Sequence, residues 1–72
     1  MTNSKLLREI IESKGFKLKF IAEKLGLSAY GFQLKLENRT EFKTGEITML
    51  CKLLDIDSLE KKEEIFFALQ DD

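Results

Sequence analysis

The sequence predicts an all-α fold, a compact bundle of four or five short helices that forms one domain over residues 1–72. Three observations support this prediction. The chain contains no proline, the residue that most strongly interrupts helices. Apolar residues recur at intervals of three and four, which is the period of an amphipathic helix. With 43% apolar and 35% charged residues, the composition is that of a globular chain with one small core.

The first predicted helix begins close to the N-terminus, where Asn3 or Ser4 can cap it. Gly15 can adopt the left-handed conformation that ends a helix, and Phe16 is expected to fold back as an apolar anchor. The apolar stripe of this helix consists of Leu6, Leu7, Ile10 and Ile11.

Two short helices are predicted next, at about residues 17–25 and 28–37. Gly26 permits a tight turn between them, Ser28 can cap the second of the pair, and Asn38 can end it in a left-handed conformation. Leu18, Ile21, Ala22 and Leu25 follow the helical spacing i, i+3, i+4 and i+7. The residues of the pair that are expected to face inward are Ile21, Leu25, Leu27, Phe32 and Leu36.

A polar loop from 39 to 43 precedes a fourth predicted helix, with Phe42 as the loop's apolar anchor. Thr44 is expected to cap this helix, and Glu46 lies in its first turn, where an acidic group suits the helix dipole. Its apolar stripe consists of Ile47, Leu50, Cys51 and Leu54.

The C-terminal segment, residues 58–69, is expected to act as a packing or interaction element. Asp57 or Ser58 can begin it, and Asp57 with Glu60 three residues later resembles a capping box. The apolar run 65–69 fits either a helix or a strand.

Charge is distributed unevenly, although the net charge is only -1. Residues 1–36 carry seven basic and three acidic side chains, a net of +4, whereas residues 37–72 carry five basic and ten acidic side chains, a net of -5. A basic half attracts phosphates, while an acidic half weakens the long-range attraction. An equally acceptable interpretation is two solvated helix faces of opposite sign.

Several function classes are disfavoured by what the chain lacks. It has no histidine, no glycine-rich phosphate loop and no spaced set of metal ligands, so we expect no enzyme, metal, cofactor or small-molecule substrate. Cys51 is the single cysteine and cannot form an internal disulfide, which favours a reducing compartment. No apolar run is long enough for a membrane span or a secretory signal. We therefore expect a cytoplasmic binding protein.

The stretch 20–28, Phe-Ile-Ala-Glu-Lys-Leu-Gly-Leu-Ser, resembles the helix-turn-helix of the XRE family, the Cro and phage-repressor type. Ala22 is small where the two helices would cross, and Gly26 occupies the turn. Residues 35–44 and 64–68 also resemble small phage-borne members of this family from Gram-positive bacteria. The resemblance covers nearly the whole chain and implies a helix-turn-helix at about residues 17–37.

The resemblance implies a bacteriophage transcription regulator that presents its third helix to a partner. In this family the exposed side of that helix reads bases of operator DNA. Gln33 could pair with an adenine edge, and Ala29 could contact a thymine methyl group. The expected DNA-contacting set, including lysines that could meet phosphates, is Lys17, Lys19, Ser28, Ala29, Tyr30, Gln33, Lys35, Arg39 and Lys43.

The same face also departs from the family pattern. Leu18 and Leu34 stand where polar residues are common, and Glu37 would repel phosphate unless it accepts from a cytosine amino group. Apolar surface of this kind favours a protein partner. The expected partner-binding set is Leu18, Tyr30, Gln33, Leu34 and Glu37.

The resemblance therefore implies an antirepressor of the lysis–lysogeny switch that binds the phage repressor and blocks its operator binding. Operator DNA, alone or together with the repressor, is a further expected partner. The alternatives are a Cro-like repressor that binds operator DNA directly and an antitoxin that binds a toxin. Under the Cro-like alternative, Leu18 and Leu34 would belong to the chain's own core.

Phe20 lies off the apolar stripe of its helix and needs cover. We expect the terminal phenylalanines, Phe66 and Phe67, to cover it within the same chain. Alternatively, the terminal segment could pair two chains.

Overall fold

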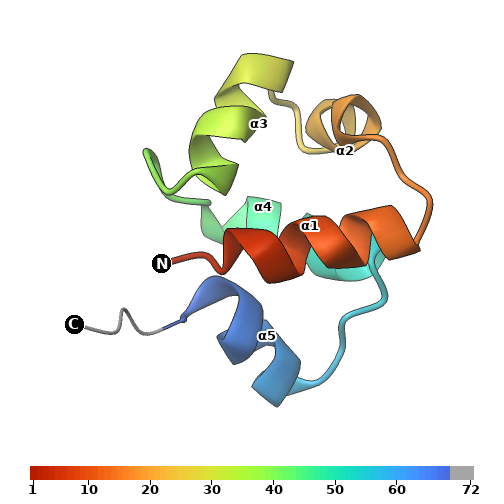
Figure 1. Ribbon diagram of the computed structural model, residues 1–72, viewed down its shortest axis with the longest axis vertical. Coiled ribbons are helices and arrows are strands. Elements are labelled where there is room, and N and C mark those ends of the chain that lie inside the picture. Colours follow the sequence, from red (N-terminus) through yellow and green to blue (C-terminus); the bar gives the residue numbers. More distant parts are fainter. Residues whose placement is uncertain (69–72) are drawn as a thin grey trace.

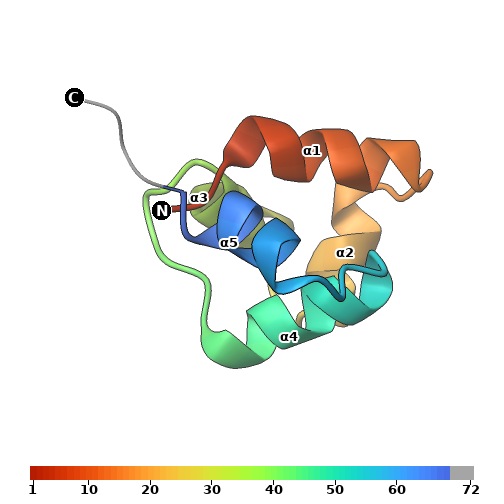
Figure 2. The ribbon, with the colours of Figure 1, turned by 90° about the horizontal axis from the view of Figure 1, so that it is seen from below.

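The computed structural model describes residues 1–68, which form five α-helices and no strand. The all-α prediction is confirmed. The helices are α1 (Ser4–Ser13), α2 (Leu18–Lys24), α3 (Ala29–Leu36), α4 (Thr44–Leu53) and α5 (Leu59–Phe66). Figure 1 shows α2 and α3 above α1, with α5 below it. Seen from below in Figure 2, α5 lies between α1 and α4.

Three helices begin at the short polar residues that the sequence predicts as caps. The side chain of Asn3 accepts a hydrogen bond from the N–H of Leu6 at 3.1 Å. The side chain of Ser28 accepts a hydrogen bond from the N–H of Gly31 at 2.9 Å. The side chain of Ser58 likewise accepts one from the N–H of Lys61 at 3.0 Å. Each cap supplies a partner for one N–H group that the first turn of a helix leaves unpaired. These local bonds explain why α1, α3 and α5 begin where they do.

Left-handed residues end the first three helices as predicted. Gly15 has φ +77° and Gly26 has φ +73°, values that cost a glycine little because it has no side chain. Asn38, with φ +62°, ends α3 in the same way. The turn after α4 contains a fourth such residue, Asp55 with φ +55°, which was not predicted.

One predicted cap and one predicted capping box need correction. Thr44 is the first residue of α4, and the cap position belongs to Lys43. The Glu46 carboxylate accepts from the N–H of Lys43 at 2.9 Å, so it supplies the bond expected of a threonine cap. At α5 the cap is Ser58, so the capping box predicted from Asp57 is wrong.

The C-terminal apolar run is helical as far as Phe66, and no part of it forms a strand up to Ala68. Leu69, the last residue of this run, lies outside the described residues, as do Asp71 and Asp72. The fifth helix thus supplies two buried residues, Ile65 and Phe66, to the core.

The core contains residues from all five helices and from the turn after α4. Phe42, predicted as the anchor of its loop, lies between two buried rings, with centroids 6.1 Å from Phe32 and 6.0 Å from Phe66, both edge-on. This column of rings ties α3 and α5 to the loop between α3 and α4. The buried apolar residues are Leu7, Ile11, Ile21, Ala22, Phe32, Leu36, Leu50, Cys51, Leu54, Ile56, Ile65 and Phe66.

The N-terminal residues join the ends of α3 and α5, beside which the N-terminus lies in Figure 1. The Asn38 side-chain amide donates to the carbonyl of Thr2 and accepts from its N–H, both at 2.8 Å. The N–H of Asn3 donates to the carbonyl of Ile65 at 2.6 Å. Through these bonds the left-handed residue after α3 becomes a fixed part of the fold. Within residues 1–68, none of the helices has the length and apolar character needed to cross a membrane.

Candidate interaction surface on α2 and α3

Helices α2 and α3 are joined by the four residues 25–28, with Gly26 in the left-handed conformation. In Figure 1, α2 is seen almost end-on while α3 runs across the view, so the two axes cross steeply. Ile21 and Ala22 of α2 and Phe32 of α3 are buried at this crossing. A connection of four residues that contains a glycine is common in a tight turn between two crossing helices. It holds the outer side of α3 away from the core.

The outer side of α3 carries five of the predicted site residues at helical spacing, and we call these the α3 face. Tyr30 is strongly exposed, with 72% of its surface accessible to solvent. Leu34, one turn further on, is half-buried and is not part of the core cluster of the described residues. The α3 face consists of Ala29, Tyr30, Gln33, Leu34 and Glu37.

The polar members of the α3 face bind each other. The amide nitrogen of Gln33 donates to the Glu37 carboxylate at 2.6 Å. Reading an adenine edge with Gln33 would require this bond to break or rearrange. Ser28, predicted as a DNA contact, uses its hydroxyl to cap α3. The α3 face therefore presents an aromatic ring and a leucine beside a paired amide and carboxylate.

The two leucines of the predicted partner-binding set occupy different environments. Leu18 is half-buried and packs against the core cluster from the first position of α2. Leu34 is also partly exposed, but it does not belong to that cluster or to the residues packed against it. Leu18 thus belongs to the packing around the core and not to the α3 face.

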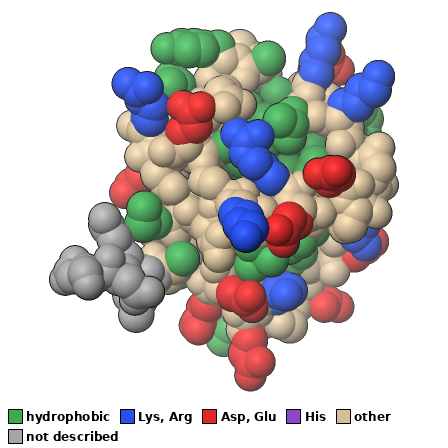
Figure 3. Space-filling view, in the orientation of Figure 1, with side chains coloured by type: hydrophobic (Ala, Val, Ile, Leu, Met, Phe, Trp, Pro, Cys, Tyr) green, Lys and Arg blue, Asp and Glu red, His purple; other side chains and the backbone are tan. Residues whose placement is uncertain are grey.

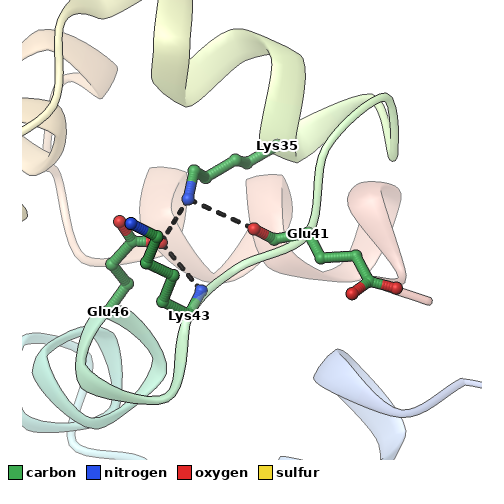
Figure 4. A network of polar contacts seen from close by, with 4 residues as sticks. All are labelled: Lys35, Glu41, Lys43 and Glu46. Carbon is green, nitrogen blue, oxygen red and sulfur yellow. Dashed lines mark hydrogen bonds and ion pairs between the residues drawn. The ribbon is translucent and has the colours of Figure 1, made fainter.

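Of the basic residues predicted to contact DNA, four are exposed and one is not. Lys35 is buried, and its ammonium group lies 2.5 Å from the Glu46 carboxylate, 3.2 Å from the carbonyl of Glu41 and 6.0 Å from the centre of the Phe42 ring. Figure 4 shows Lys35 reaching from α3 toward the first turn of α4. The expectation that Lys35 contacts phosphate therefore needs correction. The exposed residues are Lys17, Lys19, Arg39 and Lys43.

Glu46 receives two hydrogen bonds, from the Lys35 ammonium group and from the N–H of Lys43. Burial on its own raises the pKa of Glu46. The two hydrogen bonds and the nearby charges of Lys35 and Lys43 outweigh burial and hold the pKa below its ordinary value. The ionised carboxylate is therefore the form that links α3 to α4.

This lowered pKa predicts an acid-sensitive link between α3 and α4. Because folded Glu46 binds a proton less readily than unfolded Glu46, its contribution to the free energy of unfolding is complete above the unfolded pKa of about 4.5. This stabilising contribution is lost as the pH falls through the lower pKa of Glu46 in the folded chain. We expect the difference in free energy of unfolding between the native chain and Glu46→Gln to shrink from pH 6 to pH 3, measured by urea titration. A difference that stays constant over this range would contradict the assignment.

Cys51 is buried on α4 and packs as a small apolar residue. Burial raises the pKa of its thiol, with a smaller opposing effect from the charge of Lys62. The reactive thiolate is therefore disfavoured at neutral pH. In the part of the chain from residue 1 to 68, no three ligand-type side chains gather into a set that could hold a metal ion.

Comparison with known proteins connects the chain to one family. A family model described as "Protein of unknown function (DUF739)" matches residues 2–69, almost the entire chain. The chain belongs to the DUF739 family. No curated protein and no solved structure matches it.

Phe20 forms a second apolar surface on the DUF739 protein, and the prediction that terminal phenylalanines cover it is wrong. Its ring stacks on Phe16 with centroids 5.3 Å apart, and the Lys24 ammonium group lies 5.4 Å from its centre. Phe66 is instead buried against Phe42, and Phe67 is 60% exposed. The spacing of Phe16, Phe20 and Lys24, four residues each, is the local signal that could have identified this stack.

The uneven charge of the sequence reappears on the surface of the DUF739 protein. Figure 3 shows acidic side chains gathered along the lower edge, over α5, and basic side chains projecting at the upper right, over α2. Basic and acidic groups are mixed between these two edges. The surface around α2 is therefore more attractive to an anionic partner than the surface around α5.

Proposed function

We propose that this protein is a helix-turn-helix regulator of a phage lysis–lysogeny switch. It acts in the cytoplasm of the bacterial host as an antirepressor. Its α3 face binds the DNA-binding domain of the phage repressor and competes with the operator for that domain. The observation that carries this proposal is the exposed ring of Tyr30 next to the partly exposed Leu34 on one side of α3. A tyrosine and a leucine on a rigid helix are typical anchors for a protein partner.

The polar groups around these anchors favour a protein over DNA. Lys35 is neutralised by Glu46, and Gln33 is bound to Glu37, whose carboxylate would repel a phosphate backbone. The net charge of the chain is -1, so long-range attraction to DNA is weak. The basic, phosphate-binding surface of a repressor would complement Glu37. The resemblance of the sequence to the modulator of repression of lactococcal-type phages also supports this proposal.

Truncating the anchors tests the proposal. Tyr30→Ala and Leu34→Ala should each weaken the complex with the isolated repressor DNA-binding domain by about 1–3 kcal/mol, because each leaves a pocket of the partner unfilled. Calorimetric titration measures the dissociation constant. Leu59→Ala on α5 is the matched control, since Leu59 is 71% exposed and lies outside the α3 face. An unchanged dissociation constant for both α3 variants would rule out this face.

A Cro-like repressor is the second candidate, favoured by the four exposed basic residues of the predicted DNA set, Lys17, Lys19, Arg39 and Lys43. This candidate requires tight operator binding that falls steeply with salt concentration. It also requires Gln33→Ala to lose a base preference at one operator position. Those two results, together with the absence of binding to the phage repressor, would overturn the antirepressor proposal in favour of a Cro-like repressor. A toxin captured in place of the repressor would support the antitoxin alternative.

A further inference from the structure

The junction of α1 and α2 contains an open hollow of about 430 Å³ lined by both aromatic and charged residues. Its apolar wall is the stacked pair Phe16 and Phe20, whose ring planes differ by 19°. No lining residue belongs to α3, so the hollow is distinct from the α3 face. We call it the α1–α2 hollow. It is lined by Gly15, Phe16, Lys17, Lys19, Phe20 and Glu23.

The aromatic wall of this hollow is fixed in position but incompletely covered. Phe16 is half-buried and packs against the core cluster directly after the left-handed Gly15. Phe20 stacks on it and keeps 38% of its surface exposed. A large aromatic ring held on a rigid support and left open to solvent can bury further area when a partner's side chain fills the hollow.

The charge around the hollow is mostly positive. Lys17, Lys19 and Lys24 are exposed, and no ion pair found within residues 1–68 includes any of them. Glu23 is the single acidic residue of the lining. In Figure 3, basic side chains project from the molecule over α2. This arrangement complements an anionic partner.

We propose that the α1–α2 hollow binds an acidic protein segment that inserts one aromatic or aliphatic side chain against Phe20. The lysines pair with the carboxylates that flank the inserted side chain. Glu23 accepts a hydrogen bond from a backbone N–H of the segment. A nucleic acid fits less well, because a phosphodiester backbone has no donor for Glu23 and repels its charge. The hollow is large enough for one such side chain and part of the backbone that carries it.

This surface goes beyond the proposed function, since it uses none of the residues of the α3 face. Its test is an NMR titration of the full chain with the synthetic peptide acetyl-DEFLDE-amide. We expect amide shifts confined to residues 15–24 and saturation at millimolar or lower peptide concentration. The peptide DEAADE, which lacks the inserted side chains, should bind about tenfold more weakly or worse.

Two variants connect the binding to the hollow. Phe20→Ala removes the open ring and should weaken peptide binding about tenfold, and Lys19→Glu should do so while leaving the apolar wall intact. Tyr30→Ala should bind the peptide as the native chain does, so a failure of the α3 face and a failure of the hollow are distinguishable. Absence of shifts, equal binding of DEAADE, or tighter binding of oligo-dT at the same residues would overturn the proposal.

Discussion

Replacing Lys35 by methionine is expected to lower the free energy of unfolding by about 2–4 kcal/mol, slightly below the range for fully buried ion pairs. The side chains of Lys35 and Glu46 are only 10% and 12% exposed. Without Lys35, the carboxylate of Glu46 stays largely removed from water and keeps only the N–H of Lys43 as a partner. An uncompensated charge of this kind costs more than the ion pair contributes. Urea unfolding followed by circular dichroism measures the effect.

The double variant Lys35→Met, Glu46→Gln distinguishes two effects of removing Lys35. One is the unpaired charge left on Glu46, and the other is the lost contact between the two side chains. Its glutamine still accepts from the N–H of Lys43 but carries no charge, so it should recover more than half of the lost stability. Lys61→Met provides the control, because Lys61 and Glu64 form an exposed pair 3.8 Å apart. We expect that change to cost about 0.5 kcal/mol or less. If Lys35→Met is as mild as Lys61→Met, the pair has no structural role.

The parts of the fold that depend on local chemistry were predictable from the sequence. The caps at Asn3, Ser28 and Ser58 each act over three residues, and the left-handed turns at Gly15 and Gly26 depend on one residue each. Helical spacing then identifies the buried stripes. These signals are all contained within one or two helical turns, so a single sequence reveals them.

The features that depend on distant residues were not predictable in the same way. From the sequence alone, Lys35 is indistinguishable from a surface lysine, because its partner Glu46 lies eleven residues later on another helix. Whether a charged residue is buried depends on how α3 and α4 pack, and no periodicity within one helix records that packing.

The exposed side of α3 was predictable from helical spacing, whereas the burial of Leu18 was not. Helical spacing places Tyr30, Gln33, Leu34 and Glu37 on one side of α3, and the fold leaves that side outside the core. The bond between Gln33 and Glu37 follows the same spacing of four residues. Leu18 is different, because the crossing of α2 against the core decides its burial. Helical spacing thus predicts which residues share one side of a helix, whereas tertiary packing decides which of those residues remain exposed to a partner.

Phe32→Ala is expected to have the largest effect of all, a loss of about 3–5 kcal/mol in the free energy of unfolding. Phe32 is 1% exposed, and its ring meets Phe42, which in turn meets Phe66. Removing it opens a cavity where α3, the following loop and α5 come together. A chain of 72 residues has a total stability of only about 4–11 kcal/mol. The variant should therefore lose a large fraction of its stability and unfold at a markedly lower temperature, which thermal denaturation followed at 222 nm measures.

Phe67→Ala is the matched control for this prediction, because Phe67 has the same side chain, lies on the C-terminal side of α5 and is 60% exposed. Its loss should change the free energy of unfolding by about 0.5 kcal/mol or less. Phe32→Leu keeps part of the side-chain volume, so its free energy of unfolding should lie between those of the two alanine variants.

That order of stabilities would show that the aromatic column of Phe32, Phe42 and Phe66 holds α3 in place. Since Tyr30 and Leu34 are carried by the same helix, the column also fixes the geometry of the α3 face. Equal stabilities for Phe32→Ala and Phe67→Ala would contradict the packing described for the core.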